Sequence, residues 1–356
     1  MSSHPIAHIH LDPSKPISPL RDAHPQHRAH EHKHLPHPTA LKVHPGGKST
    51  GTENARLYFV GTATTILEWE GVRIMTDPNF LHAGDHVHLG PGVTGTRLTN
   101  PSIDLHDLPR IDLVLLSHYH ADHFDQHVEA SLNRALPILT TPHAHTALTT
   151  KSPEEDNFTA VTALDTWQSA LLHITPPSQS SSAPVGNPDA ENRGPPLIKV
   201  TAMPGHHVPP LLAKVNELAG AVPPTNGWMV ELGRGREEEV KEVGYRMYIT
   251  GDTLYVDELK SIPERYPDVD LMVVHLGGTT IPSPSLPLLM VTMDAKQGIQ
   301  LVHLINPDVT LPVHYDDYDV FLSPLTDFQE AMASAGLGEK VAYLDRGDAY
   351  AFSVRG

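Results

Sequence analysis

The sequence contains no cysteine. It also has no apolar run that approaches the length of a membrane-spanning helix, about 18 residues. Without cysteine the chain forms no disulfide, no thiolate metal site and no cysteine nucleophile, so any metal must be bound through nitrogen and oxygen. The lack of cysteine is also compatible with a reducing compartment. Because the first thirty residues have no apolar signal-peptide core, we expect a cytoplasmic protein without stable membrane anchoring.

Positive charge is scarce as well. The 25 lysines and arginines are outnumbered by 42 aspartates and glutamates, which gives a formal net charge of −17. Residues 1–50 hold six basic and three acidic residues, so the remainder carries 19 − 39 = −20. Such a surface repels the phosphates of nucleic acids and anionic lipids. We therefore expect a small-molecule substrate and no nucleic-acid partner; the oligomeric state stays open.

Histidine and proline are abundant, with 26 and 34 copies, and ten of the histidines lie in residues 1–50. Because this segment has no periodic apolar pattern, we predict a disordered tail. Clustered imidazoles bind transition metals without any fold, so a metal-buffering role for the tail is the alternative to a plain solvated extension. Residues 51–356 can form one large domain with a low-complexity surface insertion at residues 175–196.

Short β-patterned runs dominate the domain and later alternate with helical patterns. The continuously apolar run 112–117 is typical of a strand buried on both faces. Helices are expected near residues 126–134, 294–304 and 324–335. This order predicts an α/β (or α+β) fold, a four-layer sandwich of two packed sheets with helices on their outer faces. Other strands are expected at residues 56–61, 63–69, 72–78, 137–141, 196–203, 227–233, 245–250, 270–276, 308–313, 340–345 and 350–354.

A cluster of metal-ligand residue types, Ser-His-Tyr-His-Ala-Asp-His-Phe-Asp, follows the buried strand at residues 117–125. In an extended segment His118 and His120 point to the same side and can bind one ion. Asp122 and His123, on the turn that follows, can face a second ion beside the first. Four such side chains on one short loop would destabilise the fold through desolvation and mutual repulsion unless a partner compensated them. The cluster therefore predicts a metal centre.

This nonapeptide resembles the signature of the metallo-β-lactamase superfamily, and further motifs of that superfamily follow in order. They are Met-Pro-Gly-His-His-Val-Pro at 203–209, Tyr-Ile-Thr-Gly-Asp-Thr at 248–253 and Leu-Pro-Val-His-Tyr-Asp-Asp at 311–317. The resemblance runs from about Tyr58 to Val354. It implies the αββα metallo-β-lactamase sandwich and a dinuclear site with two divalent metal ions. Zinc is the first expectation, with Mn²⁺ or Fe²⁺ as alternatives because nitrogen and oxygen ligands accept all three.

The resemblance also implies the ligands of the first ion. His118, His120 and one of His206 or His207 would bind it. His207 is favoured because similar branches of the superfamily place this ligand three residues after the proline, here Pro204.

The second ion would be bound by Asp122, His123 and His314, with Asp252 between the two ions. Asp77 lies in a tight Asp-Pro turn and would orient ligand histidines from behind.

The same resemblance implies a hydroxide bridging both ions as the nucleophile, and Asp122 would orient or deprotonate the parent water. His275, at the end of the expected strand 270–276, could donate a proton to the leaving group or be a structural imidazole. Tyr119 and Tyr315 flank predicted ligands and could be proton donors or packing residues.

The form Ser-His-x-His-x-Asp-His-x-Asp resembles the branch that contains ascorbate-6-phosphate lactonase and N-acyl-phosphatidylethanolamine phospholipase D. With the acidic surface, it predicts a metal-dependent hydrolase that opens a small cyclic amide or ester, a lactam or lactone. A phosphodiesterase of the phospholipase D kind is the alternative, for which Pro209–Val215 is the candidate membrane-facing patch. A non-catalytic metal-binding protein is the third alternative.

Overall fold

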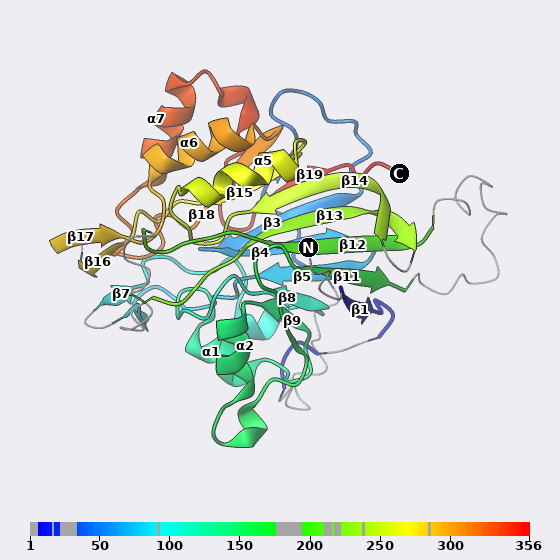
Figure 1. Ribbon diagram of the computed structural model, residues 1–356, viewed down its shortest axis with the longest axis horizontal. Coiled ribbons are helices and arrows are strands. Elements are labelled where there is room, and N and C mark those ends of the chain that lie inside the picture. Colours follow the sequence, from blue (N-terminus) through cyan, green and yellow to red (C-terminus); the bar gives the residue numbers. More distant parts are fainter. Residues whose placement is uncertain are drawn as a thin grey trace.

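Two β-sheets packed face to face form the centre of the molecule (Figure 1). The computed structural model describes residues 6–15, 18–21, 34–90, 93–175, 194–209, 216, 222–236, 239–283 and 286–356. The seven-stranded sheet contains, in spatial order, β1 (Ala7–Leu11), β11 (Ser169–Ile174), β12 (Pro196–Met203), β13 (Gly227–Arg236), β14 (Glu239–Ile249), β15 (Leu271–His275) and β18 (Val309–Val313). The eight-stranded sheet contains β10 (Val161–Ala163), β9 (Ile138–Thr140), β8 (Leu113–Leu115), β5 (Val72–Thr76), β4 (Thr64–Trp69), β3 (Ala55–Gly61), β19 (Ala349–Phe352) and β2 (Leu41–Lys42).

Two short hairpins and a set of helices complete the described fold. The hairpins pair β6 (His86–His88) with β7 (Thr94–Thr96) and β16 (Thr280–Ser283) with β17 (Leu286–Met290). The α-helices are α1 (Gln126–Ser131), α2 (Pro142–Thr149), α5 (Ser261–Arg265), α6 (Ala295–Ile305) and α7 (Leu325–Ser334). Short 3-10 helices are η2 (Leu105–Asp107), η3 (Glu154–Asp156), η5 (Asp257–Lys260) and η6 (Gly338–Lys340).

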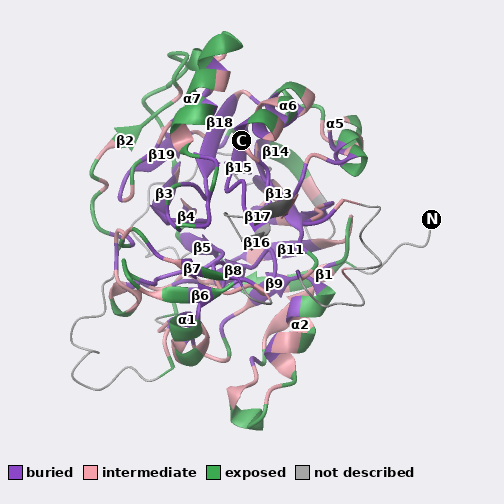
Figure 2. Ribbon diagram, turned by 90° about the vertical axis from the view of Figure 1, so that its left-hand side faces the viewer, coloured by how far each residue is buried: buried purple, intermediate pink, exposed green. Residues whose placement is uncertain are grey.

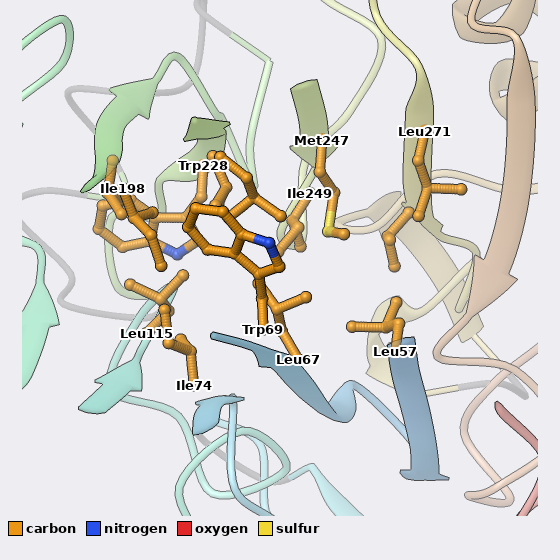
Figure 3. Packing of buried hydrophobic residues seen from close by; sticks show 14 of the residues in the cluster. Leu57, Leu67, Trp69, Ile74, Leu115, Ile198, Trp228, Met247, Ile249 and Leu271 are labelled. Carbon is orange, nitrogen blue, oxygen red and sulfur yellow. The ribbon is translucent and has the colours of Figure 1, made fainter. Parts of the chain in front are cut away.

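The core lies between the two sheets, where apolar side chains of both inner faces interdigitate. Trp69 of β4 and Trp228 of β13 are both buried and lie close together in it (Figure 3). Ile74 and Leu115 continue the same layer along β5 and β8. All three residues of β8 are buried, because β8 lies between β5 and β9 with packing on both faces.

Helices cover both outer faces, so the predicted α/β four-layer sandwich is confirmed. α5, α6 and α7 lie on the seven-stranded sheet, and α1 and α2 lie on the eight-stranded sheet (Figures 1 and 2). Helix α6 shows why: Leu301, Val302 and Ile305 form its buried face. The Asp294 side chain accepts a hydrogen bond from the backbone N–H of Gln297 and caps the start of the helix.

The amino-terminal segment departs from the prediction. β1 pairs in parallel with β11 at the edge of one sheet, and β2 pairs in parallel with β19 at the edge of the other. For residues 6–15 and 34–50 the prediction of a disordered tail is therefore wrong. The physical reason is a short alternation in β1, where Leu11 is buried and packs in the core. Residues 176–193 of the predicted insertion lie outside the described residues.

One predicted strand is not formed. Residues 340–345 make a single isolated bridge, from Val341 to Thr310 of the edge strand β18, so they touch the seven-stranded sheet without forming a ladder. Within the described ranges, no helix combines the length and the apolar character that crossing a membrane requires.

Candidate metal centre

The predicted metal ligands lie on loops that follow the carboxyl ends of strands. His118 lies three residues after β8, Asp252 three residues after β14, and His314 directly after β18. β12, β14, β15 and β18 run in the same direction, so their carboxyl ends share one edge of the seven-stranded sheet. The loop after β8 meets this edge from the other sheet. Motifs far apart in the sequence are thereby brought to one place.

One group of buried side chains consists of Asp122, His123, Asp252 and His314. Nε2 of His123 lies 3.1 Å from Nε2 of His314 and 3.3 Å from Oδ2 of Asp252. Nε2 of His314 lies 3.4 Å from Oδ2 of Asp122 and 3.6 Å from Oδ2 of Asp252. Ligand atoms about 2.1 Å from a tetrahedral ion lie roughly 3.4 Å apart. The group therefore has the spacing that one metal ion requires.

A second group shares Asp252 with the first and adds His118 and His207. The ring centroids of His118 and His207 are 4.5 Å apart, and the ring of His120 lies 5.6 Å from that of His118. Nδ1 of His120 is engaged in a 2.8 Å hydrogen bond with Oδ1 of Asp122, which leaves Nε2 for another partner. Six of the seven predicted ligands thus lie in two groups that meet at Asp252, and His120 lies in a further group with His118 and Asp122.

Unpartnered buried atoms test whether these residues fit a cation. Five of the seven predicted ligands carry a buried atom without a hydrogen-bond partner in the described part of the chain, namely Nε2 of His118, His120 and His207, Nδ1 of His314 and Oδ1 of Asp252. An unsatisfied buried polar atom costs about 1–3 kcal/mol, more when it is charged. Because a bound divalent ion would satisfy lone pairs of this kind, the groups fit a metal site.

For the two carboxylates and for His207, the electrostatics point the same way. Burial would raise the pKa of Asp122, but His120 and His123 outweigh it and hold that pKa well below its usual range. The pKa of Asp252 is likewise low, because His314 and His123 outweigh the effect of its burial. Burial lowers the pKa of His207 to about 4, against the opposing charge of Asp252. Ionised carboxylates and a neutral imidazole are the forms that bind metals.

Asp77 supports the loop after β8. Its Oδ1 accepts a 2.7 Å hydrogen bond from the backbone N–H of Ser117, and its Oδ2 lies 3.3 Å from Nδ1 of His123. A carboxylate at Nδ1 fixes the tautomer and directs Nε2 of His123 toward the metal position. The structure thus places Asp77 where the sequence predicted an orienting residue.

Two glycines allow the close approach of the loops. A Cβ atom on Gly277 would lie 3.0 Å from Nδ1 of His314, so a side chain there would displace the imidazole. Gly251, directly before Asp252, has a φ of 60° and would place a Cβ atom 2.4 Å from the carbonyl oxygen of Asn226. Only glycine tolerates both conditions.

The structure separates the two candidate histidines of the third motif. Nδ1 of His207 donates a 2.9 Å hydrogen bond to the carbonyl of Val291, so its Nε2 lone pair faces His118 and Asp252. His206 belongs to neither ligand group and is half-buried. Its backbone N–H donates to the hydroxyl of Thr253.

We expect His207→Gln to lower metal content by at least one ion per chain, whereas His206→Gln leaves it unchanged. The reason is that, of these two histidines, His207 is the one that belongs to a ligand group, where its buried Nε2 has no hydrogen-bond partner among the described residues. Elemental analysis of both variants beside the wild type measures this. An equal loss in both variants would contradict the assignment.

The two tyrosines predicted near the site point elsewhere. The hydroxyl of Tyr119 donates a 2.7 Å hydrogen bond to Glu129, and Lys151 lies over the Tyr119 ring at 5.3 Å from its centroid. The hydroxyl of Tyr315 donates to the carbonyl of Leu344 at 3.2 Å. These contacts argue against proton donation by Tyr119 or Tyr315, because both hydroxyls are committed to partners outside the ligand groups.

His275 is enclosed behind the ligands. It is fully buried, its Nδ1 lies 3.2 Å from the hydroxyl of Thr250, and its Nε2 lies 3.8 Å from Oδ2 of Asp77. Its ring stacks on that of His123 at a centroid distance of 6.0 Å. Burial and neighbouring histidines hold its pKa well below the usual range. This position opposes the predicted role as proton donor to a leaving group and favours the structural alternative.

Three supporting residues were not anticipated from the sequence. The hydroxyl of Thr292 donates a 2.9 Å hydrogen bond to Oδ2 of Asp252. The amide of Asn79 donates to the carbonyl of Asp122 at 3.0 Å and to the hydroxyl of Tyr318 at 2.8 Å. Asn79 follows the Asp-Pro turn closely, so proximity to Asp77 is the one sequence signal that could have indicated it.

Comparison with known families and proteins places this geometry in context. Residues 72–315 match a family model described as the beta-lactamase superfamily domain. A protein of Salinibacter ruber named UPF0173 metal-dependent hydrolase is 24% identical over 290 residues, which cover 80% of this chain and 95% of that protein.

Solved structures share the architecture. The isothiocyanate hydrolase from Delia radicum gut bacteria superposes with a TM-score of 0.61 at 17% identity, covering 84% of this chain and 100% of that one. A possible metal-dependent hydrolase from Veillonella parvula gives a TM-score of 0.61 at 15% identity, covering 84% and 99%. At these identities the likeness concerns the fold.

Proposed function

The chain belongs to the beta-lactamase superfamily of metal-dependent hydrolases, and on that premise we propose that it binds two divalent ions and opens a small cyclic ester or amide. The observation that carries the proposal is Asp252, which belongs to both ligand groups. Its Oδ2 lies near His123 and His314, while its Oδ1 has no hydrogen-bond partner among the residues that the structure describes. One carboxylate offered to two groups supports a two-ion site, with zinc as the first expectation and Mn²⁺ or Fe²⁺ as alternatives.

Bound divalent ions supply Lewis acidity, which polarises a carbonyl oxygen and acidifies water. The residues of the chain position the reactants. Asp122 lies beside Asp252 in the first group, so we assign it the orientation of the attacking water. His118 and His123 are fully buried and held by Ser117 and Asp77, which keeps the ligand geometry fixed during turnover.

An apolar cluster beside His314 supports an uncharged organic substrate. The ring of Phe321 lies 4.3 Å from that of His314, centroid to centroid. A net charge of −17 on the chain disfavours polyanionic substrates. An uncharged ring such as a lactone or lactam suits this environment best. The cluster contains Leu81, Val87, Leu89, Val93, Tyr318, Val320 and Phe321.

The alternatives from the sequence have less support. Residues 210–215 of the candidate membrane-facing patch lie outside the described residues. The hypothesis of a phospholipase D-like phosphodiesterase therefore rests on the resemblance alone. A non-catalytic metal-binding protein would keep the ligand groups without turnover. The cytoplasmic location and the absence of nucleic-acid partners stay predictions from the sequence.

The test is turnover by the metal-loaded full chain on a panel of γ- and δ-lactones, a β-lactam and an aryl phosphodiester. We expect ring opening of a lactone or lactam, seen by mass spectrometry as addition of one water. In an Asp122→Asn variant we expect kcat/KM to fall by about 10²–10⁴, the usual contribution of a positioned acid or base.

Asp257→Asn is the matched control, because its carboxylate is 90% exposed on η5 and pairs only with Lys260 among the described residues. It should behave as wild type. Cleavage of the phosphodiester alone would replace the lactone proposal with the phosphodiesterase alternative. No turnover by fully metal-loaded protein would leave the non-catalytic alternative.

A further inference from the structure

Three histidines meet on one side of strands β1 and β11, away from the ligand groups. Nδ1 of His8 lies 2.9 Å from Nε2 of His173, within hydrogen-bond distance. The ring of His173 is stacked between the two others, at centroid distances of 5.2 Å from His8 and 4.9 Å from His10. His8 and His10 are exposed, and His173 is half-buried.

Strand geometry explains the cluster. In β1 the side chains of His8 and His10 alternate with Ile9 and Leu11, and the latter two pack against the core. β1 and β11 are parallel, with His10 directly opposite His173 in the register. All three imidazoles therefore project from the same outer side of the sheet edge, where β1 is the terminal strand (Figure 1).

We propose that His8, His10 and His173 form a separate metal site that takes one divalent transition-metal ion through three imidazole nitrogens. Neutral imidazole is a preferred ligand of Zn²⁺, Cu²⁺ and Ni²⁺, whereas Mg²⁺ and Ca²⁺ prefer oxygen. Two of its ligands come from the histidine-rich segment 1–50, whose described residues contribute no ligand to the metal centre.

The distance between the nitrogens of His8 and His173 favours replacement of their shared proton by a metal ion. Two imidazole nitrogens at 2.9 Å share one proton, which sits on one nitrogen and faces the lone pair of the other. An ion with Zn–N bonds of about 2.05 Å holds two nitrogens roughly 3.3 Å apart, so an opening of about 0.4 Å replaces the proton by the ion. The ring of His10 lies 4.9 Å from that of His173, centroid to centroid, so the exposed His10 side chain must rotate to bring a third nitrogen to the same ion.

Metal binding at this site would tie the amino-terminal strand to the sheet. His8 and His10 belong to β1, whereas His173 belongs to β11, more than 160 residues later in the chain. An ion held by both strands must be released before β1 can leave the sheet edge. Occupancy therefore stabilises the docked strand by mass action.

The experiment is hydrogen exchange of the full, untagged chain, read by mass spectrometry on the peptide that contains residues 7–11. With the catalytic site already loaded, free zinc at about 100 times the dissociation constant should slow exchange through β1 opening by up to about 100-fold. Magnesium at the same concentration should leave the exchange unchanged. Equal protection by magnesium would overturn the imidazole site.

Two single variants and a control decide the assignment. His10→Asn and His173→Asn should each abolish the zinc protection. Because His173 lies on β11, its variant tests the site without changing a residue of β1. His143→Asn, at an exposed histidine of α2, should keep it. Zinc protection that persists in both ligand variants, or that is absent in the wild type, would overturn the proposal. Turnover is not the readout, so failure here leaves the proposed hydrolase untouched.

Discussion

An Asp252→Ala variant of the full chain should lose at least one metal ion and nearly all turnover. The carboxylate belongs to both ligand groups, with Oδ2 3.3 Å from Nε2 of His123 and 3.6 Å from Nε2 of His314. Its removal leaves both groups one ligand short. For a residue on which the reacting unit as a whole depends, we expect kcat/KM to fall by about 10⁴ or more.

Metal content is measured by elemental analysis after dialysis and expressed as the difference from wild type, because surface histidines contribute equally to both proteins. The full chain is used since β1 and β2 belong to the sheets. Thr292→Val, which removes only the hydrogen bond to Oδ2 of Asp252, should weaken metal binding by about 10–100-fold. An Asp252→Ala protein with wild-type metal content and turnover would contradict the shared-ligand assignment.

The four-layer fold and the first four ligands could be predicted because their signals are local. His118, His120, Asp122 and His123 lie within six residues, directly after a strand whose continuous apolar pattern marks it as buried. The other ligands each follow a strand at its carboxyl end, and parallel strands bring such ends together. The assignment of His207, Asp252 and His314 depended on the resemblance to the metallo-β-lactamase superfamily, because no local pattern links their motifs to the loop after β8.

Side-chain direction was the weaker part of the prediction, although one signal was available. In an extended segment neighbouring side chains point to opposite sides, so Tyr119, between His118 and His120, faces away from them. Its hydrogen bond to Glu129 agrees with this rule. By contrast, the contact of Thr292 with Asp252 joins residues 40 positions apart and has no local pattern.

Composition misled the prediction for the amino-terminal segment. Many histidines and prolines suggest disorder, yet the five residues of β1 alternate in burial and pair along β11. A strand of this length is too short to stand out from its surroundings, and its partner lies about 160 residues away. Only tertiary pairing with an existing sheet edge makes it a strand.

A second large effect, on the free energy of unfolding, is expected at the buried ion pair of Asp317 and Arg97. The Asp317 side chain is fully enclosed, accepts a 2.8 Å hydrogen bond from the backbone N–H of Thr62 and lies 3.6 Å from Nη2 of Arg97. Arg346 donates to the same carboxylate at 2.9 Å from its Nε. The Arg97 side chain is fully enclosed too, so its charge depends on Asp317 for compensation.

Asp317→Asn should therefore lower the free energy of unfolding by about 3–5 kcal/mol, the usual cost of leaving one member of a buried pair uncompensated. Urea denaturation of metal-depleted protein measures this cost without the added effect of metal binding. The exposed pair Asp257–Lys260 gives the control, and Asp257→Asn should have no measurable effect on unfolding. A similarly small change for Asp317→Asn would show that water or neighbouring acceptors such as the carbonyl of Thr99 compensate the charge of Arg97.

The double variant Arg97→Met, Asp317→Asn should be less destabilised than the sum of the single variants, because it removes the uncompensated charge along with its partner.

The same network reaches the metal centre through the backbone. Thr62 donates to Asp317, and its carbonyl accepts a 2.8 Å hydrogen bond from the backbone N–H of His314, whose φ is 61°. Loosening Asp317 therefore releases the residue that holds His314 in this unfavourable conformation, so metal affinity should fall together with stability in Asp317→Asn.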